Sequence, residues 1–439
     1  MFQERLRSHH DAERKLAELL GRMPPGPAAI TGRGHSETGA APLDQNLRLE
    51  ARLNEKPDGK KAALYVHVPY CDHTCSFCNL NRKERQGVDL DAYADQVVSE
   101  MKTWGAFPYV RKLKLEAVYF GGGTPTALTA RQFANIFKTI KDSFTLSEDC
   151  EITVESTLHN LGADKAAALE SCGVNRLSIG IQTFSDRGRK LLGRFFTGVK
   201  AEKELAALRN AFGGILGIDV IYSYPGQTLP ELRRDADLCI ASGIDSVSFY
   251  PLMIQPKSAL AAAIEQGKIA FTRDIAVEIE LHNLFYHALK NAGFDLLELS
   301  KLVRPASDRY RYIQFQYGAG DIIPAGSGAG GKIAGFSVYS TGGRRMVSAP
   351  APRYDSCHRI LGRLQFGLYD PALIAGIAGP EKLAAITDAM TSLEREGLLE
   401  LQAGKSTWKP TVDGVFWGNN MAVKIIEAAI TAHEAVWRK

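Results

Sequence analysis

The sequence predicts an α/β protein built on an open (β/α)6 barrel, a partial TIM barrel. Between residues 62 and 250, short β-branched or aromatic runs alternate with longer helical patterns, six times in all. This alternation is typical of parallel βαβ units joined by right-handed crossovers. Polar motifs also fall at the carboxyl ends of the strand-like runs, where α/β barrels place their active sites. A flat doubly wound sheet is the alternative.

The elements follow from these patterns in order along the chain. The expected strands are 63–68, 116–120, 151–156, 175–180, 217–222 and 246–250. The expected helices are 90–104, 130–141, 164–171, 199–209 and 228–241, with a further long helix over 273–291. The expected domains are an N-terminal arm (1–61) packing on the main domain, the barrel core (62–265), a barrel extension and substrate-side segment (266–345) and a C-terminal domain (346–439). The last part reads helix, helix, short hairpin, helix, which is a mainly helical, winged-helix-like outline that we expect to act as a lid.

Composition narrows the class of protein. The 439 residues are 45% hydrophobic and 23% charged, as in an ordinary globular protein with ample core material. A net charge of +4 is too mild to indicate nucleic acid as a partner. We expect no signal peptide and no membrane span. Because four of the seven cysteines are widely scattered, a disulfide framework is not expected, and a reducing, cytoplasmic setting fits best.

The most informative stretch is the loop after the first strand, which carries Cys71, Cys75 and Cys78. Three thiols at spacings of four and three residues can converge on one metal centre. A structural zinc or an electron-transfer cluster normally takes four protein ligands. A cube of four irons held by three cysteines keeps one iron open for a substrate or cofactor. Zinc with a fourth ligand from elsewhere in the chain is the alternative.

Further polar residues follow the other strands. Gly121-Gly122-Gly123-Thr124-Pro125 follows the second strand, and its glycines would let the backbone approach a ligand closely or simply form a tight turn. Glu155 ends the third strand, where a buried carboxylate needs a cationic partner, from a ligand or from a nearby Arg. Gln182 follows the fourth strand, and Asp219 lies within the fifth.

Together these residues resemble a known family. The stretch Tyr65-x-His67-x-Pro69-Tyr70-Cys71-x3-Cys75-x2-Cys78 is similar to the radical S-adenosylmethionine (SAM) enzymes. More narrowly, roughly residues 62–340 resemble the oxygen-independent coproporphyrinogen III oxidase group. The resemblance implies a [4Fe-4S] cluster on the three cysteines, whose open iron is chelated by the amino and carboxylate groups of SAM. Reduction of the cluster then breaks a C–S bond of SAM and releases methionine and a 5′-deoxyadenosyl radical.

The resemblance also implies site residues. It assigns cofactor contacts to Tyr65, Phe77, Gly122, Gly123, Thr124, Glu155, Gln182, Arg194 and Asp219. Among these, Glu155 would accept from the SAM ammonium, while Gln182, Arg194 and Asp219 would contact the ribose or carboxylate of SAM or a second SAM molecule. Ordinary core or surface-pair roles are the alternative for these three, and Phe77 is otherwise simply part of the core.

Three residues are candidate catalytic side chains: Tyr65, His67 and His159. In the family the position of His67 lies near the cluster and SAM; a lone strand histidine is otherwise a satisfied core residue. His159 departs from the oxidase pattern after Glu155, and it places an imidazole near the barrel mouth, where it could face an iron porphyrin. A solvated loop residue is the alternative reading of His159.

Other departures favour one branch of the group. Asn79, the stretch Glu155–Asn160 and the run Arg309-Tyr310-Arg311-Tyr312 look most like the ChuW/HutW family of anaerobic haem-degrading enzymes, the anaerobilin synthases. The region from Asp308 to Tyr317 also replaces the His-Asn-x-x-Tyr-Trp motif of haem chaperones.

The resemblance to that branch implies a function. SAM would serve as radical source and as methyl donor, so two molecules are expected, with a reductase or flavodoxin-type protein as electron donor. Haem would be methylated at a meso carbon and opened to a linear tetrapyrrole, with release of iron. The aromatic run would stack on the macrocycle and its arginines would pair with propionates; a strand with one aromatic face is the alternative. Oxygen-independent coproporphyrinogen III oxidation and a haem-binding chaperone without ring-opening activity remain alternative functions.

Overall fold

The computed structural model describes residues 12, 15–16, 18–19, 42–56, 60–78, 80–318, 320–349 and 352–430. Most of the expected N-terminal arm, including most of its helix-like stretch, and Asn79 lie outside these residues. The described part of the arm includes the helix α2 (Pro42–Leu53), which buries Leu49 and Leu53 against the barrel. Ala12 and Leu16 are buried instead in the core of the C-terminal domain. The described arm residues therefore contact both parts of the chain.

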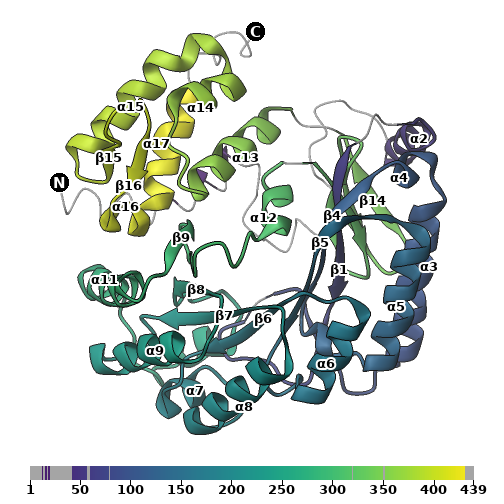
Figure 1. The fold of residues 1–439 in the computed structure, drawn as a ribbon, viewed down its shortest axis with the longest axis horizontal. Helices are drawn as coiled ribbons and strands as arrows, with labels where there is room; N and C mark the ends of the chain where they lie inside the picture. Colours follow the sequence, from purple (N-terminus) through teal and green to yellow (C-terminus); the bar gives the residue numbers. More distant parts are fainter. Residues whose placement is uncertain are drawn as a thin grey trace.

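Six neighbouring parallel strands form the centre of a curved, twelve-stranded sheet (Figure 1). These strands are β1 (Lys61–Val68), β4 (Lys114–Gly122), β5 (Thr145–Ser156), β6 (Arg176–Gln182), β7 (Ile215–Tyr222) and β8 (Ser246–Pro251). The crossover helices α3 (Leu90–Ala106), α5 (Ala130–Ser143), α6 (Ala163–Cys172), α8 (Gly198–Ala211) and α9 (Leu229–Ala241) cover the outer face. This architecture confirms the predicted open (β/α)6 barrel.

Local signals explain where the crossover helices begin. Asp89 accepts hydrogen bonds from the first backbone N–H groups of α3. Thr129 and Gln132 form a reciprocal capping box at the start of α5, and Thr228 and Glu231 form another at α9. Such caps satisfy backbone donors that the first helical turn leaves free. The sequence thus specifies the points at which these three strand-to-helix turns end.

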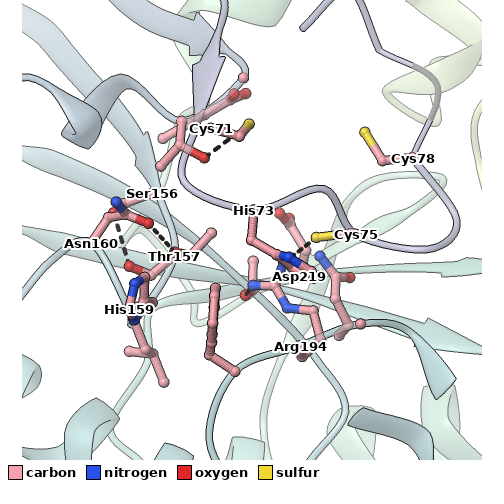
Figure 2. A pocket seen from close by; sticks show the side chains of 18 of the residues that line it. Cys71, His73, Cys75, Cys78, Ser156, Thr157, His159, Asn160, Arg194 and Asp219 are labelled. Carbon is pink, nitrogen blue, oxygen red and sulfur yellow. Dashed lines mark hydrogen bonds between the residues drawn. The ribbon is translucent and has the colours of Figure 1, made fainter. Parts of the chain in front are cut away.

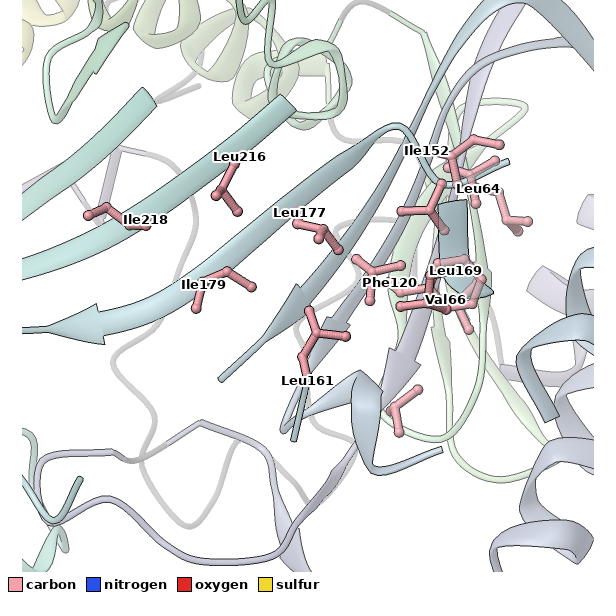
Figure 3. Packing of buried hydrophobic residues seen from close by; sticks show 14 of the residues in the cluster. Leu64, Val66, Phe120, Ile152, Leu161, Leu169, Leu177, Ile179, Leu216 and Ile218 are labelled. Carbon is pink, nitrogen blue, oxygen red and sulfur yellow. The ribbon is translucent and has the colours of Figure 1, made fainter. Parts of the chain in front are cut away.

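The two faces of each central strand differ in chemistry. Outward side chains such as Leu64, Phe120, Leu177 and Ile218 interlock with the helices in one continuous core (Figure 3). Each fully buried side chain of this size contributes about 1.5–3 kcal/mol. The opposite face points into the barrel lumen and carries most of the polar side chains discussed below. Because side chains alternate along a strand, one register places the apolar set outside and the functional set inside.

Strands from the barrel extension complete the sheet at both edges. β10 (Lys301–Val303) pairs antiparallel with β8 and with β9 (Asp295–Glu298). At the other edge, β11 (Asp321–Ala325) runs parallel to β1, followed by the antiparallel strands β12 (Gly330–Ile333), β13 (Phe336–Ser340) and β14 (Arg345–Ser348). The long helix α11 (Ile275–Asn291) matches the helix expected over 273–291.

The aromatic run forms a short helix, α12 (Arg311–Gln316), where the sequence left open a strand. The carboxylate of Glu151 accepts from the backbone N–H groups of Arg311 and Tyr312, at 3.0 and 3.4 Å. Asp308 accepts from the N–H of Tyr310 and forms a fully buried, two-bond pair with Arg176, at 3.1 Å from Nε and 2.9 Å from Nη2. These buried carboxylates hold α12 against the inside of the barrel.

The arginines of the run do not face the cysteine loop. Arg309 and Arg311 both pair with Asp149, towards the beginning of β5 and so towards the amino end of the barrel. The cysteine loop lies beyond the carboxyl end of β1. The structure therefore contradicts the expected contacts of these arginines with porphyrin propionates.

The C-terminal domain has its own hydrophobic core and lies beside the barrel in Figure 1. It contains α13 (Pro352–Gln365), α14 (Pro371–Ala378), α15 (Leu383–Arg395), the hairpin β15 (Leu399–Leu401) and β16 (Trp408–Pro410), α16 (Val412–Phe416) and α17 (Gly418–Ile430). This order has the winged-helix-like outline that the sequence predicts. Among the described residues, no helix is both long and apolar enough to cross a membrane.

Removal of the Asp308 carboxylate should destabilise the barrel strongly. The variant Asp308→Ala leaves the buried Arg176 guanidinium uncompensated, so we expect the free energy of unfolding to fall by about 3–5 kcal/mol. Chemical denaturation followed by circular dichroism measures this loss. Asp149→Ala is the matched control, because it removes an exposed arginine partner, and it should cost far less. Equal losses in the two variants would contradict a structural role for the buried pair.

Candidate functional site

The cysteine loop is closed at its base by backbone hydrogen bonds. The short strand β2 (Tyr70–Cys71) pairs with β3 (Lys83–Glu84). Lys83 N–H donates to the carbonyl of Pro69 at 2.7 Å, and Arg85 N–H donates to the carbonyl of Cys71 at 2.9 Å. The intervening segment must therefore bulge away from the barrel rim, which brings all three cysteines to the wall of one cavity of about 310 Å³.

Side chains fix the loop against neighbouring elements. Asp72 forms an ion pair with Arg85 at 2.6 Å and accepts a hydrogen bond from Asn160, which lies beyond β5. Arg82 donates to the Thr74 hydroxyl at 2.6 Å and to the Cys78 carbonyl at 2.7 Å. These contacts come from both ends of the loop and from beyond another strand, so they tie the loop to its surroundings on several sides.

The three thiols surround a common space rather than a single point (Figure 2). Cys71 is buried, whereas Cys75 and Cys78 are partly exposed. Burial raises the pKa of the Cys71 thiol, and a hydrogen bond from Thr124, at 3.3 Å, opposes that shift. Arg194 donates to the sulfur of Cys75 at 3.0 Å. Two of the three loop sulfurs thus accept a hydrogen bond from a side chain of this chain.

No three His, Cys, Asp or Glu side chains of the described residues gather closely enough to hold a single metal ion. A zinc ion would need its ligands about 2.3 Å from one centre. Three cysteine thiols in the wall of one cavity are a donor set that fits a [4Fe-4S] cluster with one open iron. Structural zinc stays the alternative.

The glycine turn after β4 packs directly against the end of β1. Gly122 has a φ of 116°, and a Cβ there would lie 2.7 Å from the His67 ring. A Cβ at Gly123 would lie 2.7 Å from the backbone of Pro69. Contacts within the chain thus already require glycine at both positions. The turn also places Gly122, Gly123 and Thr124 in the cavity wall, and their contacts with SAM stay a prediction.

Glu155 lies at the carboxyl end of β5 and lines the cavity. Its carboxylate accepts from the Tyr119 hydroxyl at 2.5 Å and from the Gly122 N–H at 3.3 Å. Burial raises its pKa to about 7; these hydrogen bonds oppose the shift, and the charge of Asp219 adds to it. Among the described residues no arginine forms an ion pair with this carboxylate, so it is suited to accept from a cationic or N–H-bearing ligand.

Gln182, Arg194 and Asp219 lie in the same cavity wall. Gln182 has a φ of 74° at a bulge between β6 and β7, an unusual conformation that turns its amide toward the cavity. Its buried Oε1 has no hydrogen-bond partner among the described residues, as expected of an atom that awaits a ligand. Asp219 accepts from the Tyr250 hydroxyl at 2.9 Å, and Arg194 also donates to the Gly180 carbonyl.

Tyr65 and His67 lie behind the glycine turn and do not line the cavity. His67 Nε2 is 3.0 Å from the Asn81 carbonyl, which can only accept, so Nε2 carries the proton. Nδ1 then accepts from the Tyr65 hydroxyl at 2.9 Å. Burial lowers the pKa of His67. The structure places both side chains in the layer that supports the site, and their catalytic roles remain predictions.

The cavity mouth carries an exposed aromatic pair. His159 stacks on Phe195 with ring centroids 4.0 Å apart, and His73 meets the same phenyl ring edge-on at 5.1 Å. Phe195 keeps 42% of its surface exposed. Figure 2 shows His159 beside the loop residues Thr157 and Asn160. Phe77 also lines the cavity and packs partly on the cluster around Leu192.

Sequence reasoning missed several residues that complete the site. Tyr119 and Tyr250 touch the two acidic groups, and Asp72, Arg82 and Phe195 shape the loop and the mouth. Tyr119 shares the lumen face of its strand with Gly121, so strand alternation was the one signal that could have drawn attention to it. The partners of the others come from distant parts of the chain, which no local pattern reveals.

Comparisons with known proteins agree with this geometry. Residues 65–239 match the radical SAM superfamily. The chain is 29% identical over 288 residues to the anaerobilin synthase of Escherichia coli O157:H7, which covers 65% of this chain and 64% of that protein. It is 26% identical over 283 residues to the heme chaperone HemW of Lactococcus lactis subsp. lactis, covering 64% and 73% of the two chains. The matched region spans less than two thirds of the anaerobilin synthase.

A solved structure shows the same fold over nearly the whole chain. The coproporphyrinogen III oxidase HemN of Escherichia coli, described as a radical SAM enzyme, superposes with a TM-score of 0.72 at 20% identity. The match covers 91% of this chain and 98% of that one. The barrel, its extension and the C-terminal domain thus share one architecture with that structure. The family match implies a [4Fe-4S] cluster and SAM as cofactors, which the donor set of the cavity accommodates.

Substitution of one loop cysteine should abolish cluster binding. We expect the anaerobically reconstituted protein to hold about four iron atoms per chain and Cys75→Ala to lose most of them, because two thiolates cannot retain the cube. Iron analysis and the visible absorption of the cluster measure this. Cys172→Ala, which changes a free cysteine outside the loop, should keep the wild-type iron content. Full iron retention in Cys75→Ala would contradict the assignment of the loop.

Proposed function

We propose, from the radical SAM domain that residues 65–239 of this chain carry, that the protein is an anaerobic haem-degrading methyltransferase. It would methylate the porphyrin, open the ring to a linear tetrapyrrole and release the iron, using SAM as radical source and as methyl donor. Two molecules of SAM and a reductase or flavodoxin-type electron donor are part of the proposal. A reducing, cytoplasmic setting is also part of the proposal.

The observation that carries the proposal is the composition of one cavity. Its walls combine the three loop thiols, the acidic side chains Glu155 and Asp219, and the exposed ring pair of His159 and Phe195 at the mouth. The thiols that would hold the radical source and the rings that would meet the porphyrin therefore line one space. The similarity to an anaerobilin synthase favours haem as the molecule that binds there.

The chain supplies distinct groups for each part of the reaction. Cys71, Cys75 and Cys78 would hold the cluster, which together with bound SAM supplies a 5′-deoxyadenosyl radical. Thr124 and Arg194 donate hydrogen bonds to the sulfurs of Cys71 and Cys75. The remaining wall residues would orient SAM through hydrogen bonds: Glu155 with the amino group, and Gln182 and Asp219 with the polar groups of the sugar or of a second SAM.

The mouth of the cavity would bind the substrate. The His159 imidazole would bind the porphyrin iron, for which its ring would turn out of the stack on Phe195 and stand across the porphyrin plane. The arginines of the aromatic run are engaged by Asp149, so propionates would have to pair elsewhere. The C-terminal domain would act as a lid, as its position beside the barrel in Figure 1 allows.

Two other functions follow from the relatives and must be separated by experiment. A heme chaperone relative raises the possibility of haem binding without ring opening. The structural likeness to coproporphyrinogen III oxidase makes oxidative decarboxylation the second alternative function. At 20% identity this likeness shows the fold alone. The three functions differ in what happens to the tetrapyrrole, so product analysis distinguishes them directly.

Anaerobic incubation with SAM, a reductant and haem should destroy the porphyrin. We expect loss of the Soret band, a methylated linear tetrapyrrole by mass spectrometry and free ferrous iron by chelator assay. Cys75→Ala is the control that should leave haem intact. Stoichiometric recovery of unchanged haem from the wild type would favour the chaperone function, and decarboxylation of coproporphyrinogen III with no attack on haem would favour the oxidase.

The imidazole at the mouth should contribute to haem affinity. We expect His159→Ala to weaken haem binding by about tenfold or more, equal to at least about 1.4 kcal/mol, because an iron ligand is lost. A Soret titration of the protein without added SAM measures the affinity and the ligand-dependent band position. His287→Ala removes an exposed imidazole on α11 and should change neither. An unchanged titration of His159→Ala would contradict the proposed role at the iron.

A further inference from the structure

Glu155, whose carboxylate is proposed to bind the SAM amino group, forms a hydrogen bond with Tyr119. Tyr119 in turn packs on residues that lie deeper in the barrel. Tyr119 on β4 donates its hydroxyl to Glu155 at 2.5 Å. This hydrogen bond is the shortest direct contact between the carboxylate and another side chain. The Tyr119 ring is buried and points into the lumen, so its position depends on what fills the barrel beneath the cavity.

The side chains that fill the barrel beneath the cavity come from α12. Tyr312 stacks on Tyr119 with ring centroids 4.3 Å apart and an interplanar angle of 23°. It also stacks on Tyr65 at 5.7 Å and 19°. One ring therefore supports two tyrosines on neighbouring strands, of which one bonds Glu155 and the other bonds His67. Stacked pairs of this kind contribute beyond the burial of their area.

The helix that carries Tyr312 is firmly placed. Glu151 accepts from the first N–H groups of α12, and Asp308 links the preceding residue to Arg176. The support for Glu155 thus runs through rigid, buried contacts from the amino half of the lumen to the wall of the cavity. None of these supporting residues touches the cavity itself.

We propose that Tyr119 is a positioning residue for the SAM amino group, which holds Glu155 ionised and turned toward the cavity, and that the Tyr312 ring keeps Tyr119 in place. The inference rests on the SAM site of the proposed function, and it is independent of whether haem is the substrate. It also assigns a role to the aromatic run: Tyr312 acts within the barrel floor, as a support for the cofactor site.

Electrostatics supports this geometry. Burial and the charge of Asp219 on β7 raise the pKa of Glu155, whereas Tyr119, the Gly122 N–H and Arg176 on β6 lower it. The remaining polar groups that face Glu155 are the hydroxyls of buried tyrosines, namely Tyr65 on β1 and Tyr310 and Tyr312 at α12. Burial raises the pKa of these tyrosines, so they stay neutral. Loss of the Tyr119 hydroxyl would therefore raise the pKa of Glu155 above its present value of about 7.

The test measures SAM affinity in the absence of haem. Full-length, cluster-reconstituted protein is titrated with SAM by anaerobic calorimetry at several values between about pH 6 and pH 9. We expect Tyr119→Phe to bind SAM about tenfold more weakly near pH 7.5, because a hydrogen bond to a charged group is lost. The ratio of the two affinities should shrink toward about pH 9, where Glu155 is ionised in both proteins. Titration of SAM itself cancels in this ratio.

Matched variants separate positioning from general damage. Tyr312→Phe keeps the stacked ring and should retain wild-type affinity, whereas Tyr312→Leu should weaken SAM binding. Tyr369→Phe removes a buried tyrosine hydroxyl in the C-terminal domain and should leave affinity unchanged. Iron content and the thermal melting midpoint confirm that each variant is folded and carries its cluster.

The outcomes are distinct from those of the haem assay. A wild-type affinity in Tyr119→Phe, or a loss that is the same at every pH, would overturn the inference. Equal effects of Tyr312→Phe and Tyr312→Leu would overturn the role of the stacked ring. If the protein does not open haem, the SAM affinities still test the role of Tyr119. If it does open haem but the variants show the SAM affinities that overturn the inference, the inference is still wrong.

Discussion

The inside of this barrel depends on how one buried guanidinium is neutralised. Arg176 points into the lumen with no solvent contact, and the carboxylate of Asp308 meets it with two hydrogen bonds. Since an unpaired buried charge is strongly destabilising, the segment that carries Asp308 must cross the lumen. That crossing places α12 inside the barrel and brings Tyr312 beneath Tyr65 and Tyr119. The neutralisation of Arg176 by Asp308 thus fixes where α12 lies, and α12 supports the tyrosines next to the cavity.

The same strands serve two different environments. Their outer side chains form one apolar core with the helices, whereas their inner side chains carry the acids, the glutamine and the tyrosines of the cavity wall. Parallel strands all end at the same rim of the barrel. The strand ends themselves therefore bring together residues that are far apart in the sequence. The cysteine loop adds the thiols to this rim because β2 and β3 close its base and Asp72 ties it to Asn160.

The polar groups at the rim differ in the hydrogen bonds that they already make within the chain. Glu155 accepts two hydrogen bonds within the chain, yet burial keeps its pKa near 7, so a bound amino group would stabilise it further. Gln182 leaves a buried oxygen without a partner in the described part of the chain. Arg194 donates a hydrogen bond to the sulfur of Cys75. Among these groups, Gln182 carries the one acceptor oxygen that still lacks a partner within the described residues.

The sequence by itself determined the barrel, its strand order along the chain, the three-thiol loop and the acids at the strand ends. These features are local: β-branched runs, helix caps and cysteine spacing act over a few residues, and parallel topology then brings the strand ends together. The interpretation of the aromatic run was only partly correct. Its rings do stack, but on tyrosines of the barrel, and its arginines pair with Asp149.

Only the tertiary structure decided what supports the site. The bond between Tyr119 and Glu155 joins two strands, and the stack of Tyr312 on Tyr119 joins the barrel to a segment almost two hundred residues further along. Which buried carboxylate meets Arg176 likewise depends on how the chain crosses the lumen. Such pairings are selected by desolvation and packing in three dimensions, and a single sequence carries no local signal for them.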